Sequence, residues 1–223
     1  MTSKRAVLWD LDGVLVDTME VHFRAWVASM AHFGIDNYTR EDFIRTFGMT
    51  NRAILPTFFP DATLEEIDAM SEYKEKAFRD LVPGNVHILP GAEAWLKQFK
   101  SWGLAQAIAS SAPIENIDSL ADAMHIRPYF NALVSAYELG SKPSPAVFLK
   151  AAEMVGVPPQ ECMVVEDAPA GIEAASRAGM TCLAVETSHA AALLGRATRV
   201  VKNLEHFSLE DARLLLELDG AVA

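Results

Sequence analysis

Short, nearly continuous apolar segments recur along the sequence. The first covers residues 5–10, Arg-Ala-Val-Leu-Trp-Asp, and ends abruptly in an acid. Others follow residue 90, at 104–109, 132–134, 162–165, 181–185 and 200–201. A strand that is buried on both faces of a parallel sheet has this pattern, because neither face meets water. These segments therefore predict the strands of one buried parallel sheet.

Helical patterns lie between these segments, at 92–102, 114–125, 146–155 and 170–178. Several of them stop at a glycine, namely Gly103, Gly156 and Gly179. Glycine readily adopts the left-handed backbone conformation that ends a helix. Because strands and helices alternate, we expect an α/β fold with a doubly wound parallel sheet.

Residues 17–88 interrupt this alternation, because their apolar positions favour helices and no segment of weight favours a strand. Apolar residues repeat at helical spacing from Phe23 to Met30, and Gly34 follows where that helix is expected to end. Later helices are expected to start at two capping boxes, Thr39-x-x-Asp42 and Thr63-x-x-Glu66.

The predicted domain organisation follows from this interruption. We expect residues 1–16 and 89–223 to form an α/β core, and residues 17–88 to form a helical domain inserted directly after the first strand. Pro83-Gly84 and Pro90-Gly91 punctuate the return to the α/β pattern.

Composition and charge narrow the class of protein. Hydrophobic residues make up 51% and charged residues 22%, as in globular proteins, and the formal net charge is −11. A surface this acidic repels phosphodiester backbones and anionic lipid, so neither nucleic acid nor membrane is an expected partner. Asp10 and Asp12 interrupt the only early apolar stretch, which argues against a signal peptide. Cys162 and Cys182 lack zinc-type spacing, and we expect them to be reduced in a cytoplasmic protein.

Polar residues follow the predicted strands at several points. They are Asp10, Asp12 and Gly13 after the first strand, Ser110 and Ser111 after 104–109, and Glu166 and Asp167 after 162–165. The loop Gly140-Ser-Lys142-Pro143 precedes a helix and adds one cation. Ligands of an open parallel sheet bind beyond the carboxyl ends of its strands. We therefore expect these side chains to meet at a single edge.

Carboxylates that are crowded together repel one another unless they take up protons or bind a cation. An all-oxygen set of ligands suits Mg²⁺ rather than zinc. With the metal bound, one carboxylate could attack phosphorus while Mg²⁺ and Lys142 neutralise the charge on the transferred group. A second carboxylate two residues along could pass protons. The pattern predicts phosphoryl transfer through an aspartyl-phosphate.

Four segments resemble the motifs of the haloacid dehalogenase superfamily, in the expected order. They are Asp-Leu-Asp-Gly-Val-Leu-Val-Asp-Thr at 10–18, Ile-Ala-Ser-Ser at 108–111, Ser-Lys-Pro at 141–143, and Val-Val-Glu-Asp-Ala-Pro-Ala-Gly at 164–171. The helical insert resembles the small cap domain of this family. Within the superfamily, the chain looks most like the phosphatases similar to β-phosphoglucomutase.

The resemblance implies a role for each matching residue. Asp10 would be the nucleophile and a magnesium ligand, and Asp12 the acid/base, which also ligates magnesium through its main-chain carbonyl. Ser110 and Lys142 would hold the phosphoryl group. Asp167, aided by Glu166, would complete the metal site.

Weaker candidates for substrate contact are Ser111, Thr18, His22, Arg52 and Lys74. Lys74 falls on an apolar helical stripe and either extends along it or meets an anion; similar caps place a lysine in this region, so we favour the anion. His22 lies in a string that looks like the mutase, where the histidine couples cap closure to the acid/base. Arg52 could reach a second anionic group of the substrate, whereas Thr18 could equally be a capping residue.

The expected function is a Mg²⁺-dependent phosphatase acting on a small phosphorylated metabolite, with a sugar phosphate-like phosphomonoester as substrate. We expect a monomer or weak homodimer.

Three alternatives remain open. The first is a β-phosphoglucomutase-type sugar phosphomutase, although Ser110-Ser-Ala-Pro113 lacks the lysine and asparagine of the mutase. A haloacid dehalogenase is a more distant possibility. The third is a non-catalytic phospho-acceptor domain, which the helical insert disfavours.

Overall fold

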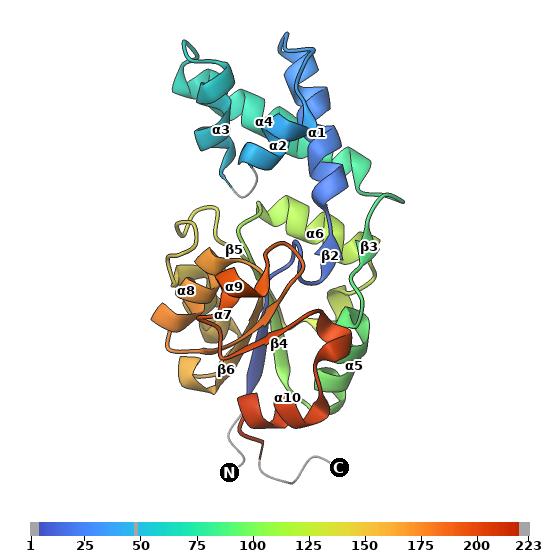
Figure 1. Ribbon diagram of the computed structural model, residues 1–223, viewed down its shortest axis with the longest axis vertical. Coiled ribbons are helices and arrows are strands. Elements are labelled where there is room, and N and C mark those ends of the chain that lie inside the picture. Colours follow the sequence, from blue (N-terminus) through green and yellow to red (C-terminus); the bar gives the residue numbers. More distant parts are fainter. Residues whose placement is uncertain (1–4, 47–48, 219–223) are drawn as a thin grey trace. The chain divides into compact units, whose positions relative to one another are not determined.

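A computed structural model describes residues 5–46 and 49–218 of the chain. The chain divides into two compact units (Figure 1). The α/β unit comprises Met1–Asp17 and His87–Ala223, and the helical unit comprises Thr18–Val86.

Six parallel strands form the sheet of the α/β unit, in the order β5-β4-β1-β6-β7-β8. They are β1 (Ala6–Trp9), β4 (Ala105–Ser110), β5 (Ala132–Ser135), β6 (Cys162–Glu166), β7 (Thr181–Val185) and β8 (Arg199–Val201). Each matches one of the predicted apolar segments, so the expected α/β fold class is confirmed. From β1 the chain builds β4 and β5 on one side of the sheet and then crosses over to build β6, β7 and β8 on the other side. β4 and β6 therefore flank β1. That crossover is where ligands of such sheets bind.

Helices cover both faces of this sheet (Figure 1). They are α5 (Ala92–Ser101), α6 (Ile114–Ala123), α7 (Ala146–Val155), α8 (Pro169–Arg177), α9 (Ala191–Leu194) and α10 (Leu209–Leu215), with the 3-10 turns η1 (Arg127–Tyr129), η2 (Pro159–Glu161) and η3 (Leu204–His206). Leu8 packs in one cluster with Phe148 of α7 and Ile172 of α8. On the other face, the Trp9 ring lies 5.9 Å from that of Phe99 of α5.

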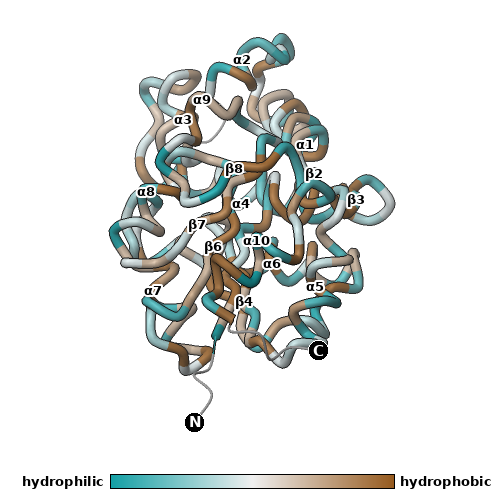
Figure 2. Tube along the Cα trace, turned by 60° about the horizontal axis from the view of Figure 1, so that its bottom comes forward, coloured by the Kyte–Doolittle hydropathy of each residue, from teal (hydrophilic) through white to brown (hydrophobic). Residues whose placement is uncertain are grey.

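Burial on both faces explains why the strand segments are so uniformly apolar. All four residues of β1 have no exposed surface. The tube along β6 and β7 is correspondingly coloured as hydrophobic in Figure 2. Trp9 carries the one polar side-chain atom of β1, its indole nitrogen, which donates to Gln106 Oε1 at 3.0 Å inside the core. This bond satisfies the one polar atom that burial would otherwise leave without a partner.

The helical unit consists of α1 (Met19–His32), α2 (Arg40–Thr46), α3 (Asn51–Phe58) and α4 (Leu64–Leu81). Its core is an apolar cluster that includes Trp26, Met30, Phe43, Leu55 and Ile67. The predicted capping box at the start of α4 is present, with reciprocal bonds between Thr63 and Glu66. This arrangement satisfies main-chain donors that the first helical turn cannot satisfy itself.

The sequence indicated no strand of weight within residues 17–88, but the structure has two very short strands at the borders of this segment. Val16–Asp17 (β2) and His87–Ile88 (β3) form a two-stranded antiparallel ribbon in the α/β unit. Strands of two residues are too short to produce a recognisable alternation of apolar and polar positions.

No helix within residues 5–46 and 49–218 is both long enough and apolar enough to cross a membrane.

Candidate active site

The carboxyl ends of β4, β1 and β6 place several of the predicted residues at one edge of the sheet. Asp10 directly follows β1, Ser110 ends β4, and Glu166 ends β6. The main-chain nitrogen of Asp10 donates to the Val165 carbonyl at 3.0 Å, which continues the β1–β6 pairing by one residue. Parallel neighbours end at the same edge, so these residues converge although they are far apart in sequence.

Three carboxyl groups gather at this edge. Ligand oxygens of Asp10, Glu166 and Asp167 all lie within 4.8 Å of one another. Only 8%, 1% and 4% of these residues, respectively, is exposed. Oxygens bound to one Mg²⁺ at about 2.1 Å lie about 3–4 Å apart. The spacing and the all-oxygen chemistry of the cluster therefore fit a magnesium ion.

Lys142 supplies a positive charge to this acidic cluster. Its Nζ donates to Asp10 Oδ1 at 2.6 Å and to Glu166 Oε1 at 2.7 Å, and its side chain is 8% exposed. One ammonium cannot balance three ionised carboxyl groups. The cluster therefore favours a further cation or bound protons.

Glu166 has both of its carboxylate oxygens engaged. Oε1 accepts from Lys142, and Oε2 accepts from the main-chain nitrogens of Asp167 at 2.8 Å and Ala168 at 3.0 Å. Gly171 makes room for it, because a Cβ added there would lie 1.7 Å from Oε1. These contacts orient Lys142 and the start of α8.

Burial and mutual repulsion shift the acid–base equilibria of this cluster. Burial raises the pKa of Asp10 well above its usual value, Lys142 opposes the shift, and Glu166 and Asp167 add to it. Burial, reinforced by Glu166, raises the pKa of Asp167 to about 7. Burial acts to lower the pKa of Lys142, but Asp10 and Glu166 outweigh it and raise that pKa. Without a metal, Asp167 therefore gains and loses its proton near neutral pH, while Lys142 stays charged.

The loop after β1 turns tightly at Gly13. This glycine has a φ of +80°, in the left-handed region, and its nitrogen donates to the Val16 carbonyl at 2.9 Å. A Cβ added to Gly13 would lie 2.1 Å from Asp167 Oδ2. This close approach leaves room only for glycine at position 13. The preceding residue, Asp12, is half-buried and lies near enough to raise the pKa of Asp167 further.

Ser110 and Ser111 differ in environment. Ser110 is buried, and its Oγ accepts from the Ala112 nitrogen at 3.1 Å. An accepting hydroxyl keeps its proton for donation, so this side chain can still bind an anionic oxygen. Ser111 lies just beyond β4 and is exposed.

Lys74 and His22 lie close together inside the helical unit. Lys74 is 3% exposed, and its Nζ lies 3.1 Å from His22 Nδ1 and 3.0 Å from Glu75 Oε1. His22 stacks on Phe78 with the ring centres 4.2 Å apart. Asn51 also donates to Glu75 Oε1, at 2.7 Å. The charge of Lys74 is thus matched by Glu75, a residue that the sequence analysis did not single out.

Arg52 and Thr18 are also held within the helical unit. Arg52 makes two bonds to the carboxylate of Asp68, at 2.7 and 2.8 Å. Thr18 is buried at the N-cap position of α1, but its side chain makes no capping bond. Of the five weaker candidates, Thr18, His22, Arg52 and Lys74 belong to the helical unit, whereas Ser111 belongs to the α/β unit with the acids, Ser110 and Lys142.

Sequence reasoning missed the loop after β7. Thr187 donates to the Gly13 carbonyl, and His189 Nδ1 lies 3.1 Å from the Asp167 carbonyl. The available signal was a short polar segment, Glu186 to His189, that directly follows a buried strand. The polar residues that were predicted correctly lie at the same kind of position, directly at or after the ends of β1, β4 and β6.

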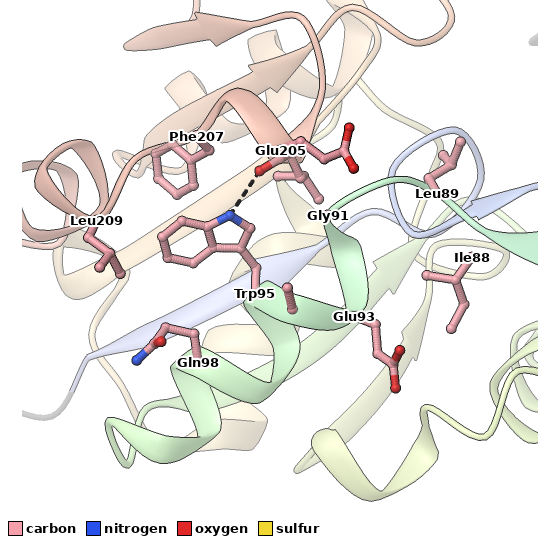
Figure 3. Close-up of a pocket in the computed structure, with 11 residues that line it drawn as sticks. Ile88, Leu89, Gly91, Glu93, Trp95, Gln98, Glu205, Phe207 and Leu209 are labelled. Atoms are coloured by element: carbon pink, nitrogen blue, oxygen red, sulfur yellow. Dashed lines mark hydrogen bonds between the residues drawn. The ribbon is translucent and has the colours of Figure 1, made fainter.

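A separate cavity of about 650 Å³ lies elsewhere in the α/β unit (Figure 3). Trp95, Phe207 and Leu209 line much of it, and the indole nitrogen of Trp95 donates to the Leu204 carbonyl at 2.9 Å. None of the predicted site residues lines this cavity. The cavity therefore does not belong to the acidic cluster.

Comparison with known proteins places the chain in a family. Residues 4–179 match the haloacid dehalogenase-like hydrolase family. The chain is 33% identical over 219 residues to Beta-phosphoglucomutase of Bacillus subtilis (strain 168), covering 92% of each. It is 30% identical over 184 residues to Fructose-1-phosphate phosphatase YqaB of Escherichia coli (strain K12), covering 80% of this chain and 95% of that protein.

Two further relatives extend the comparison. A crystal structure of beta-phosphoglucomutase from Clostridium difficile has a TM-score of 0.82 at 27% identity and covers 96% of this chain and 97% of its own. Protein SUPPRESSOR OF QUENCHING 1, chloroplastic, of Arabidopsis thaliana is 36% identical over 200 residues, which are 85% of this chain but 18% of that protein. The family resemblance inferred from the four motifs is confirmed: the chain belongs to the haloacid dehalogenase-like hydrolase family and is an enzyme.

Proposed function

We propose that this enzyme is a Mg²⁺-dependent phosphatase that hydrolyses a small phosphorylated metabolite through an aspartyl-phosphate. The observation that carries the proposal is the buried cluster of Asp10, Glu166 and Asp167, with Lys142 bridging two of them at the carboxyl ends of β1 and β6. A sugar phosphate-like phosphomonoester is the proposed substrate. The similarity to fructose-1-phosphate phosphatase YqaB supports this class of substrate.

Asp10 is the proposed nucleophile. Its carboxylate attacks phosphorus, and the bond from phosphorus to the substrate oxygen breaks as the aspartyl-phosphate forms. Lys142, held 2.6 Å from Asp10 Oδ1, and the buried Ser110 hydroxyl would bind the phosphoryl oxygens. Mg²⁺, held by Asp10, Asp167 and the main-chain carbonyl of Asp12, would neutralise the negative charge on the phosphoryl group.

Asp12 is the proposed acid and base. It gives a proton to the departing substrate oxygen, which leaves as an alcohol. It then takes a proton from a water molecule that attacks the phosphorus of the aspartyl-phosphate, which releases inorganic phosphate and restores Asp10. Glu166, with both oxygens engaged, is proposed to orient Lys142 and the main chain of Asp167.

A sugar phosphomutase is the second candidate. The similarity to Beta-phosphoglucomutase over 92% of the chain favours it. Against it, the two helical-unit cations predicted to meet substrate anions are already matched, Lys74 by Glu75 and Arg52 by Asp68. A substrate with two phosphoryl groups would gain less from side chains whose charge is already neutralised.

The test is release of inorganic phosphate from a panel of phosphorylated metabolites that includes fructose 1-phosphate, with Mg²⁺ and with EDTA. We expect release with Mg²⁺ and loss of release with EDTA. A parallel reaction with glucose 1-phosphate and a bisphosphate primer separates the alternatives. Conversion to glucose 6-phosphate without free phosphate would favour the mutase and contradict the phosphatase.

Mg²⁺ binding is expected to strengthen as the pH rises from 6 to 8. Asp167, with a pKa of about 7 in the metal-free protein, must lose its proton before it can ligate the metal. A group with this pKa is about ten times more ionised at pH 8 than at pH 6. We therefore expect the apparent dissociation constant for Mg²⁺ to be about tenfold lower at pH 8, as measured by isothermal titration calorimetry.

The stability of the metal-free protein should fall as the pH rises. The pKa of Asp167 in the folded protein lies above its ordinary value of 3.8, so its favourable contribution to the free energy of unfolding is fully present below pH 3.8. This contribution is lost as the pH rises through about 7. The increase in Tm on adding Mg²⁺ should accordingly be larger at pH 8 than at pH 6, and an equal increase at both pH values would contradict this assignment.

A further inference from the structure

The loop between β7 and α9 contacts both of the segments that carry the acidic cluster. Thr187, Ser188 and His189 occupy this loop, which we call the β7–α9 loop. Thr187 is exposed, whereas Ser188 and His189 are half-buried. The loop begins where β7 ends, with the Glu186 nitrogen donating to the Val201 carbonyl at 3.0 Å.

Thr187 joins the segment after β1 to the segment after β6. Its Oγ1 donates to the main-chain carbonyl of Gly13, 174 residues away in sequence. The same hydroxyl lies 3.4 Å from Asp167 Oδ2. Because a hydroxyl carries a single proton, Gly13 and the Asp167 carboxylate share this one donor.

Ser188 reaches the same carboxylate. Its hydroxyl forms a side-chain hydrogen bond with Asp167 and so opposes the rise in the pKa of that residue. A Cβ added to Gly13 would lie 2.7 Å from Ser188 Oγ. Gly13, Asp167 and Ser188 are therefore packed closely, with no room for an additional side-chain atom at position 13.

His189 holds the main chain of Asp167. Its Nδ1 lies 3.1 Å from the Asp167 carbonyl oxygen, and because a carbonyl can only accept, Nδ1 must carry the hydrogen. Glu166 Oε2 binds the Asp167 main-chain nitrogen. The backbone of Asp167 is thus held from both sides, and its carboxylate is contacted by Thr187 and Ser188.

We propose that Thr187, Ser188 and His189 are positioning residues, which hold the Asp167 carboxylate and the Gly13 turn in the geometry that binds the divalent cation. The inference rests on the metal site of the proposed function and adds to it a segment outside the four motifs. Side chains that orient metal ligands in this way typically change metal affinity by about 10- to 100-fold when they are removed.

The first test compares Thr187→Val, which removes the hydroxyl but keeps the shape, with Thr187→Ser, which keeps the hydroxyl. Metal-free protein is titrated with Mg²⁺ by calorimetry, and with Mn²⁺ by electron paramagnetic resonance, without substrate. We expect Thr187→Val to raise the dissociation constant about tenfold. Thr187→Ser should remain within about twofold of the wild type.

A matched control is Thr198→Val. Thr198 is also exposed, and its Oγ1 accepts from the Cys182 nitrogen at 3.1 Å, near the start of β7 rather than its end. This control, like the test variant, loses an exposed threonine hydroxyl that bonds to the main chain, but it leaves the acidic cluster untouched. It should bind Mg²⁺ as the wild type does.

His189 provides an independent test if Thr187→Val does not fold. His189→Leu removes the donor, whereas His189→Asn offers an amide hydrogen close to the position of Nδ1. We expect weaker Mg²⁺ binding for leucine and partial recovery for asparagine. Activity lost at limiting Mg²⁺ should return at saturating Mg²⁺, because the positioning residues do not touch the reacting atoms.

The outcomes separate this inference from the proposed function. If wild-type protein binds no Mg²⁺, the proposed metal site itself fails. If the wild type binds Mg²⁺ and both Thr187→Val and His189→Leu bind it within twofold of the wild type, the metal site stands and the role of the β7–α9 loop is overturned. Weak binding by Thr187→Ser equal to that of Thr187→Val would also overturn it, because the hydroxyl would then not be responsible.

Discussion

Replacing Asp10 by asparagine is expected to abolish phosphate release while leaving the protein folded. Asparagine has nearly the same shape, but its neutral amide cannot form the aspartyl-phosphate. Removal of a catalytic nucleophile typically lowers kcat by about 10⁴-fold or more. The measurements are phosphate release at saturating substrate and Mg²⁺, and a search by mass spectrometry for a phosphorylated protein in the wild type only.

The stability of the Asp10→Asn variant should not fall in parallel. Burial and the neighbouring carboxylates raise the pKa of Asp10, so its ionised form is unfavourable in the metal-free fold. Removing this charge leaves Lys142 with Glu166 as a partner at 2.7 Å. We expect the Tm of the metal-free variant at pH 8 to equal or exceed that of the wild type.

Asp36→Asn is a suitable control for this prediction, because Asp36 is exposed in the helical unit. It should retain activity. Retention of near wild-type turnover by Asp10→Asn would contradict the aspartyl-phosphate mechanism, and a large drop in Tm would contradict the electrostatic description of the cluster.

Replacing Lys142 by methionine is expected to cost both activity and stability. Asp10 and Glu166 would lose the ammonium that now lies within 2.7 Å of each. Breaking a buried ion pair by removing one partner typically costs about 3–5 kcal/mol, because it leaves uncompensated buried charge. Loss of a group that stabilises transition-state charge typically lowers kcat by about 10²- to 10³-fold.

The pH dependence of this variant gives a sharper test. The destabilisation should be larger at pH 8, where Asp167 with its pKa of about 7 is ionised and adds to the repulsion in the cluster, than at pH 5.5, where Asp167 is protonated. Mg²⁺ should recover part of the loss, because it replaces the missing positive charge. The measurements are urea unfolding at both pH values, with and without Mg²⁺, and kcat at saturating Mg²⁺.

Lys150→Met is the matched control for Lys142→Met. Lys150 pairs with Glu153 at 2.9 Å on the exposed face of α7, with 44% of its side chain accessible. Exposed pairs of this kind contribute about 0–1 kcal/mol. Equal destabilisation by the two substitutions would show that the charge of Lys142 has no special role in the cluster.

The strands could be predicted from sequence because their burial is nearly complete. β1 has no exposed residue, so its apolar run is uninterrupted until Asp10. The parallel arrangement then brings the ends of β4, β1 and β6 to one edge, which is why residues chosen by their position after strands converge in space. The ribbon of β2 and β3 escaped prediction because two residues produce no period.

The β7–α9 loop shows where reasoning from motifs ends. Thr187 and His189 act through a main-chain carbonyl each, and a carbonyl is present at every residue. No spacing in the sequence marks which carbonyl will lie within reach of which hydroxyl or ring nitrogen. Only the packing of the β7 end beside the β6 end makes Gly13 and Asp167 their partners.

The sequence by itself determined the alternation of strands and helices and the row of acids after the strands, because burial and strand direction follow from local apolar pattern. Tertiary structure alone decided which charges meet. Arg52 meets Asp68, and Lys142 meets both Asp10 and Glu166. Coulombic attraction and desolvation depend on distances through space and on burial, and neither quantity can be read from separation along the chain.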